Sequence, residues 1–273
     1  MERLLVLKLA AQGCTAAAWC NGVRVAQAGG GAPGVAPGVA SVVSVAVHEY
    51  ALAGSNRLEL VVEPDAPALD AAAPPEPAAH AMSAQLHLLL PRVGAPVDEG
   101  QARTLAQLSW QVAIGEPLAL PARRTQEAEL PIRLPRWRWL DAPVVEPTPA
   151  LRERAHAFLI TLMRDLARGQ TDSFMAATRL RTEELALAYQ RSPEDEALRL
   201  RSSLAELYAS ARLRWLPLMA EDLRLRSLAG GRLLECLNAQ GQAALTTLPD
   251  AHGSTLALPL RLSVVEGRFY VLR

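Results

Sequence analysis

The sequence has few of the residues that most often carry chemistry. Its 273 residues include three cysteines, five histidines and only 4% aromatic residues, and Lys8 is the single lysine. The 28 basic and 28 acidic residues cancel, so no long-range positive field is expected to attract nucleic acid. No stretch approaches the roughly 20 consecutive apolar residues that a membrane-spanning helix needs. We therefore expect neither nucleic acid nor a membrane span.

Cysteine, histidine and glycine are also spaced in ways that do not match the common site motifs. Five residues separate Cys14 from Cys20, which fits neither a zinc motif nor a disulfide framework. No two histidines stand four residues apart, and neither HExxH nor G-x-S-x-G occurs. The glycines at 29–31 are not followed by the lysine and hydroxyl residue of a phosphate-binding loop. We expect no metal, no cofactor and no catalytic residue, and we favour a protein that is not an enzyme.

The first residues are apolar, but Glu2 and Lys8 interrupt them and no clear cleavage site follows. This pattern indicates a first strand rather than a secretory signal. A cytoplasmic location is the resulting expectation.

The first half of the chain has the pattern of antiparallel strands. Asn21-Gly22 stands between apolar stretches and predicts a two-residue type I′ hairpin. Gly54-Ser55-Asn56 precedes an alternating Leu/Val run, and we expect it to join two antiparallel strands at residues 41–47 and 57–62. The segments 29–40 and 64–80 are rich in proline with glycine or alanine and predict long exposed loops.

From about residue 150 the apolar spacing becomes helical. It predicts a helix over 151–169. Thr171 or Asp172 is expected to cap a second helix through 174–180, and Thr182 to cap a continuation through 183–190. Ser192-Pro193 followed by acids predicts the start of a further helix. That helix is expected to bury Leu200, Leu204, Leu207, Tyr208 and Ala211. From Asp222 the period returns to two, which predicts successive antiparallel strands.

The predicted fold class is α+β. An N-terminal antiparallel β-sandwich over residues 1–146 is expected to precede a domain of helices and then antiparallel strands over 147–273. Pro121, Pro131, Pro135 and Pro143 favour short strands and edges in the first of these domains.

Two weak resemblances accompany this order. The N-terminal one depends on an aromatic and Asn-Gly hairpin, a loop, and a Leu-x-x-Gly-x-Asn turn that enters an alternating strand, formed by Trp19, Asn21, Gly22, Leu52, Gly54, Asn56, Leu58 and Leu60. This order resembles the galactose-binding-like β-sandwich, and the resemblance implies a fold more than a ligand. The helices followed by a sheet that ends in residues 267–271 resemble NTF2-like and cystatin-like domains.

A short aromatic and basic segment is the first candidate interaction surface. In an extended chain Trp137 and Trp139 would point to one side, and Arg136 and Arg138 to the other. Such a face can stack on sugars or bases, whereas two tryptophans at the end of a domain more commonly cover its core. Carbohydrate binding through Trp110, Trp137 or Trp139 is therefore a third hypothesis behind the two below.

Asp165, Tyr208 and Asp222 are the candidate ligand-binding residues of the second half, because they could line a pocket between the helices and the sheet. Arginines between residues 179 and 226 are interspersed with acids, which is typical of a solvated, ion-paired surface. A site for an anion or an acidic protein is the alternative interpretation of these arginines.

Two hypotheses follow. The preferred one is a non-catalytic bacterial accessory protein that binds another protein, for example as a partner or immunity protein of a secretion system. The alternative is a small-ligand-binding or hydrolytic protein with its pocket in the second half. The sequence leaves the partner and the oligomeric state open.

Overall fold

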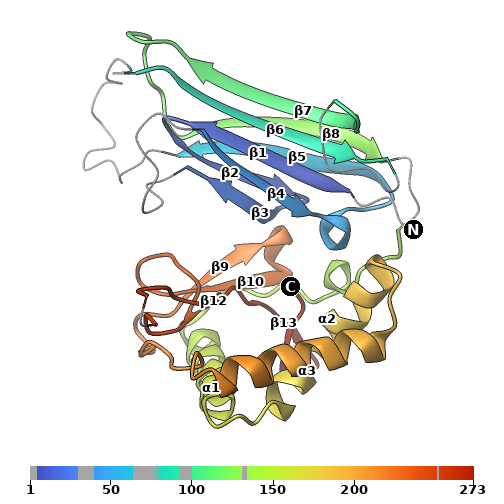
Figure 1. Ribbon diagram of the computed structural model, residues 1–273, viewed down its shortest axis with the longest axis vertical. Helices are drawn as coiled ribbons and strands as arrows, with labels where there is room; N and C mark the ends of the chain where they lie inside the picture. The colour runs from blue at the N-terminus through green and yellow to red at the C-terminus, as the bar shows by residue number, and fades with distance from the viewer. Residues whose placement is uncertain are drawn as a thin grey trace. The chain divides into compact units, whose positions relative to one another are not determined.

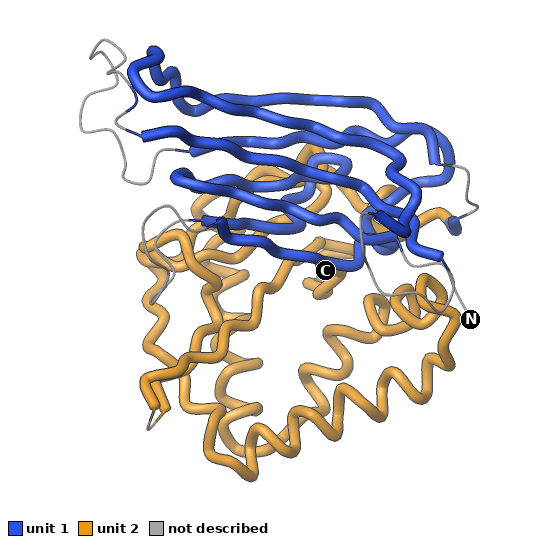
Figure 2. Tube along the Cα trace, turned by 45° about the horizontal axis from the view of Figure 1, so that its top comes forward, with its two compact units in different colours: residues 1–135 blue, residues 136–273 orange. Residues whose placement is uncertain are grey.

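The computed structural model describes residues 5–29, 40–63, 78, 80–92, 100–130, 134–250 and 252–273. The chain separates into two compact units, residues 1–135 and 136–273 (Figure 2). The division into two domains after residue 146 stays a prediction. Most of the predicted loops at 29–40 and 64–80 lie outside the described residues.

The first unit contains two four-stranded antiparallel sheets (Figure 1). In spatial order, one sheet consists of β4 (Ser41–Ala46), β1 (Val6–Gln12), β6 (Met82–Leu90) and β7 (Arg103–Val112). The other consists of β3 (Val23–Ala28), β2 (Thr15–Cys20), β5 (Gly54–Glu63) and β8 (Ala122–Leu130). Leucines such as Leu7 and Leu86 of the first sheet share one apolar core with Leu60 of the second. This arrangement confirms the predicted N-terminal β-sandwich.

The hairpin prediction at Asn21-Gly22 is confirmed. Cys20 and Val23 are directly paired, and both loop residues have positive φ angles, 51° for Asn21 and 76° for Gly22. A type I′ turn needs this conformation at both positions, which is why Asn-Gly is favoured there.

The prediction for the turn at residues 54–56 is wrong. The strands on either side lie in different sheets, since β4 pairs with β1 while β5 pairs with β2 and β8. A short 3-10 turn, η1 (His48–Tyr50), separates them. The Asn56 side chain is buried and closes the connection: its Oδ1 accepts from the Leu52 N–H at 2.7 Å, and its Nδ2 donates to the Leu52 and Gly54 carbonyls at 2.8 Å. Residues 54–56 are therefore the first residues of β5, and the Asn56 side chain supports a crossing between sheets and not a hairpin.

The second unit contains three helices and an antiparallel sheet, as predicted. The helices are α1 (Pro149–Ala167), α2 (Asp172–Ala188) and α3 (Pro193–Ala209), preceded by a 3-10 turn, η2 (Arg138–Leu140). The sheet has the spatial order β14 (Arg268–Val271), β13 (Arg261–Val265), β10 (Leu233–Leu237) and β9 (Arg224–Leu228), with a third 3-10 turn, η3 (Ala229–Gly231), between β9 and β10. The predicted start of α3 is confirmed, because the Ser192 hydroxyl accepts a hydrogen bond from the Asp195 N–H at 3.2 Å.

Three details of this unit differ from prediction. Helix α2 runs unbroken through Thr182, whose hydroxyl donates to the Thr178 carbonyl at 3.1 Å instead of capping the continuation of the helix. The strands are not consecutive neighbours, since β11 (Leu245–Thr246) and β12 (Ala257–Leu258) form a separate pair and β10 pairs with β13. Helix α3 fully buries Leu204 alone, while Tyr208 and Ala211 are exposed.

Apolar side chains fill the space between the helices and the sheet of the second unit. Leu159 and Leu162 of α1 and Phe174 of α2 belong to the same core as Leu234 of β10 and Leu262 of β13. None of the helices in the described part of the chain has both the length and the apolar composition needed to cross a bilayer.

Candidate functional site

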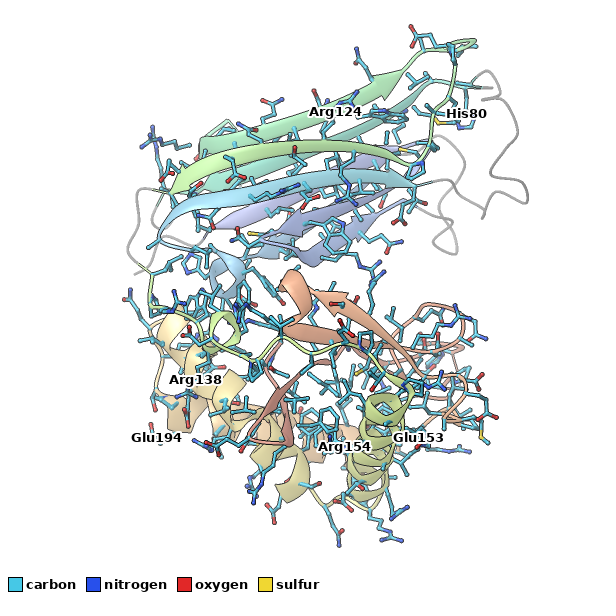
Figure 3. All side chains as sticks on the ribbon, turned by 180° about the vertical axis from the view of Figure 1, so that it is seen from behind. His80, Arg124, Arg138, Glu153, Arg154 and Glu194 are labelled. Atoms are coloured by element: carbon cyan, nitrogen blue, oxygen red, sulfur yellow. The ribbon has the colours of Figure 1, made fainter. Side chains whose placement is uncertain are left out.

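The predicted aromatic and basic segment is used within the second unit. Trp137 and Trp139 are 0% and 2% exposed, so neither ring offers a surface for a partner. Arg136 forms an exposed two-pronged ion pair with Asp141, with the Arg136 Nη2 2.7 Å from Oδ1. Arg138 projects toward α2 (Figure 3) and its Nη1 lies 2.6 Å from a carboxylate oxygen of Glu183. The segment therefore covers the core, and only its two arginines reach solvent.

A buried ion pair holds this segment against the unit. Glu184 of α2 accepts a hydrogen bond from the Arg138 backbone N–H through Oε1, and its Oε2 lies 2.6 Å from Nη1 of Arg273. The Arg273 guanidinium also lies 5.8 Å from the centre of the Trp137 ring. Three segments that are distant in the sequence thus meet at the Glu184 carboxylate, and this contact holds the segment in place.

Carbohydrate stacking through the three candidate tryptophans is wrong. Trp110 belongs to the core of the first unit, and Trp137 and Trp139 are buried in the second. A ring can stack on a sugar only if one of its faces is accessible.

Asp165, Tyr208 and Asp222 lie on α1, on α3 and in the turn before β9. Asp165 is half-buried near the end of α1, and Tyr208 is exposed, with its ring against Gly169. Asp222 is half-buried in the turn before β9, where its N–H donates to the Met219 carbonyl at 3.1 Å. Apolar side chains fill the space between the helices and the sheet, and the ligand-binding role of these three residues stays a prediction.

Cys20 and Cys236 are poorly suited to nucleophilic attack. Burial, with a further contribution from Glu49, raises the pKa of Cys20 to about 12. Burial also raises the pKa of Cys236, and the neighbouring Glu235 adds to this effect. A thiol that stays protonated at neutral pH is a weak nucleophile.

Several of the arginines between residues 179 and 226, among them Arg179, Arg199, Arg201 and Arg226, form ion pairs, in agreement with a partly paired, solvated surface. Arg179 bonds Glu183 at 2.7 Å, and Arg201 lies 3.1 Å from Asp172. Arg226 bonds the buried Glu235 across adjacent strands. Arg212, Arg214 and Arg224 have no carboxylate within ion-pair distance among the described residues, and of these three Arg212 and Arg214 line one hollow.

Arg212 and Arg214 line a hollow of about 210 Å³ that we call the Arg212 hollow. It lies between the end of α3 and the loop after β11, and its other lining residues are Ser210, Ala211, Thr247, Leu248, Pro249, Asp250 and Ser254. The two sides are joined by the backbone, since the Leu248 N–H donates to the Arg214 carbonyl at 2.6 Å. The adjoining helix end is capped, because the Arg212 N–H donates to the Leu207 carbonyl at 2.9 Å.

The Arg212 hollow is net positive. Its one carboxylate, Asp250, accepts hydrogen bonds at 2.9 Å from the backbone N–H groups of Ser254 and His252. These bonds lower the pKa of Asp250, and the charge of Arg212 lowers it further. Asp250 is thus ionised and occupied by the backbone, while two guanidinium groups remain for a ligand. Guanidinium groups bind carboxylates and phosphates through paired hydrogen bonds.

In the sequence, Arg212 and Arg214 are two members of a longer group of arginines. One signal could have separated them from Arg179, which is that no Asp or Glu lies within four residues of either. That signal does not identify the loop at residues 247–254 as the opposite wall, because no local pattern links the two segments.

Comparison with known proteins gave no relative: no protein-family model, no curated protein and no solved structure matches the chain.

Proposed function

We propose that this chain is a non-catalytic protein-binding protein whose Arg212 hollow receives an acidic segment of its partner. The observation that supports the proposal is that Arg212 and Arg214, which have no ion-pair partner in the described ranges, both line one hollow. Leu248 adds a partly exposed apolar side chain to the same wall. A basic rim beside an apolar contact suits a protein segment that carries acidic residues.

The finer expectations from the sequence belong to the same proposal. The sandwich is proposed to be of the galactose-binding-like kind, and the second unit of the NTF2-like or cystatin-like kind. A bacterial accessory or immunity role beside a secretion system, in the cytoplasm, is the proposed setting. The alternative of a small ligand or a hydrolytic reaction at Asp165, Tyr208 and Asp222 has less support, because the apolar core occupies the space where their pocket was expected.

A labelled oligo-glutamate peptide titrated onto the full chain tests the proposal, with an oligo-glutamine peptide of equal length as the uncharged comparison. The double variant Arg212→Ala/Arg214→Ala should weaken binding by roughly 3- to 30-fold, since an exposed carboxylate–arginine pair contributes about 0.3 to 1 kcal/mol. Arg103→Ala/Arg268→Ala removes the same charge from exposed arginines that do not line the hollow, and it should bind like the wild type.

Equal binding of both peptides, or equal losses in both double variants, would refute a carboxylate site at this hollow. Capture from a native lysate then tests the biological claim: one stoichiometric protein should be retained by the wild type and by the control variant, and lost with Arg212→Ala/Arg214→Ala.

A further inference from the structure

Helix α3 exposes one complete face to solvent. Leu200 and Leu207 are half-buried and Leu204 is buried, so this side of the helix packs on the core. The opposite side, at positions i, i+4, i+7 and i+11, consists of Leu198, Ser202, Ala205 and Ala209, all exposed. Leu198 is the large apolar side chain of this face and is 64% exposed. Figure 1 shows α3 as a long, continuous helix of the second unit.

We propose that this face of α3 pairs with the same face of a second copy of the chain, with the two helices antiparallel. The inference goes beyond the proposed function, since it does not involve the Arg212 hollow. If Leu198 meets Ala209 of the second copy, Ser202 meets Ala205, and the twofold axis passes between these two pairs. Small residues opposite Leu198 leave room for its side chain and let the helices approach closely.

The charges beside this face support the antiparallel direction. In an antiparallel twofold pair, each flank of a helix meets the same flank of the other copy. On one flank, Arg199 then lies at a height along the helix pair that is within about two residues of Glu206 of the second copy. These two side chains can form an ion pair, and the twofold axis produces the same ion pair a second time. On the other flank, Arg201 lies within about two residues of the height of Tyr208 of the second copy. The Arg201 guanidinium can pack on the face of that ring.

A parallel pair would place like charges together. It brings one flank of α3 against the other flank of the second copy, so that Arg201 meets Arg199 and Glu194 meets Asp195. Like charges in such positions oppose association. The same side chains that favour the antiparallel pair therefore disfavour the parallel one.

Forming the helix pair would break few ion pairs within one copy. The Glu206 carboxylate has no ion-pair partner in the part of the chain that the structure describes. Arg199 and Arg201 have exposed partners, Glu196 at 3.3 Å and Asp172 at 3.1 Å. Exposed pairs of this kind contribute little and exchange readily. One helix pair is a small interface, so the expected dimer is weak and depends on concentration.

Sedimentation velocity over a wide concentration range tests the proposal on the full chain. The apparent mass should rise from 29.3 kDa toward twice that value as concentration increases. Leu198→Glu should weaken association by about tenfold or more, since each dimer would lose two apolar contacts and acquire two desolvated charges. Leu187→Glu is the matched control, because Leu187 is 59% exposed but belongs to α2, and it should not change association.

Charge-reversal variants distinguish a specific helix pair from non-specific association. Arg199→Glu and Glu206→Arg should each weaken the dimer, and the double variant should restore it because opposite charges again meet across the twofold axis. A chain that stays at 29.3 kDa at all concentrations overturns the proposal. So does a dimer that Leu198→Glu leaves unchanged, or a double variant as weak as the two single ones. Circular dichroism should show native helix content in each variant.

Discussion

Replacing Glu184 by glutamine should destabilise the second unit strongly. Glu184 and Arg273 have side chains 6% and 1% exposed, and 2.6 Å separates the carboxylate oxygen from Nη1. The amide of the variant can still accept from the Arg138 N–H, but its NH2 group then faces the guanidinium. A buried charge that loses its partner costs about 3 to 5 kcal/mol, and the retained hydrogen bond favours the lower end, about 3 kcal/mol. The free energy of unfolding of this unit should fall by that amount.

Hydrogen exchange measured by mass spectrometry across a urea series can follow this unit separately. Peptides from α2 and β14 report on the second unit, and peptides from β1 and β6 report on the first, which should be unaffected. Arg136→Ala is the control, because it removes an exposed pair with Asp141 and should cost less than about 1 kcal/mol. A loss below about 1 kcal/mol for Glu184→Gln, or an equal loss for the control, would refute the structural role of the buried pair.

Three further outcomes are expected. Gly169→Ala should lower the melting temperature, since φ at this glycine is +74° and an added Cβ would lie 2.8 Å from the Tyr208 ring. Combining Gly169→Ala with Tyr208→Ala should remove the loss caused by the clash with the ring, while the loss caused by the positive φ remains. Asn56→Ala should cost about 1 to 2 kcal/mol in urea unfolding of the first unit, because it leaves partly buried backbone groups of the crossing without their hydrogen-bond partner. Cys20 and Cys236 should resist iodoacetamide at pH 8 until urea unfolds the chain, since burial raises the pKa of both thiols.

The local signals in the sequence predicted local structure well. Asn21-Gly22 demands positive φ at two successive residues, and few conformations other than a type I′ hairpin satisfy it. Ser192-Pro193 supplies a hydroxyl acceptor and a fixed φ at the position where a helix needs both. In each case the physical cause lies within a few residues, so a reading of neighbours is sufficient.

Predictions that depended on distant partners were less successful. The connection at 54–56 was interpreted as a hairpin because strands close in sequence often pair, yet its two strands join different sheets. Tyr208 was assigned to the buried side of α3 by spacing alone, although its ring lies against Gly169 at the end of another helix. The arginines at 212 and 214 could be recognised as lacking near acids, but not as one wall of a hollow with residues 247–254.

Buried polar groups explain why the hydrophobic period of the sequence does not predict contacts between residues that are far apart in the chain. An apolar side chain is satisfied by almost any apolar neighbour, so its period identifies a face and leaves the partner undefined. A buried carboxylate or amide is satisfied only by particular donors and acceptors at hydrogen-bond distance. Asn56 therefore selects the backbone of Leu52 and Gly54 in the first unit, and Glu184 selects Arg273 in the second. The information that fixes the topology lies in these few groups, whose partners no sequence period reveals.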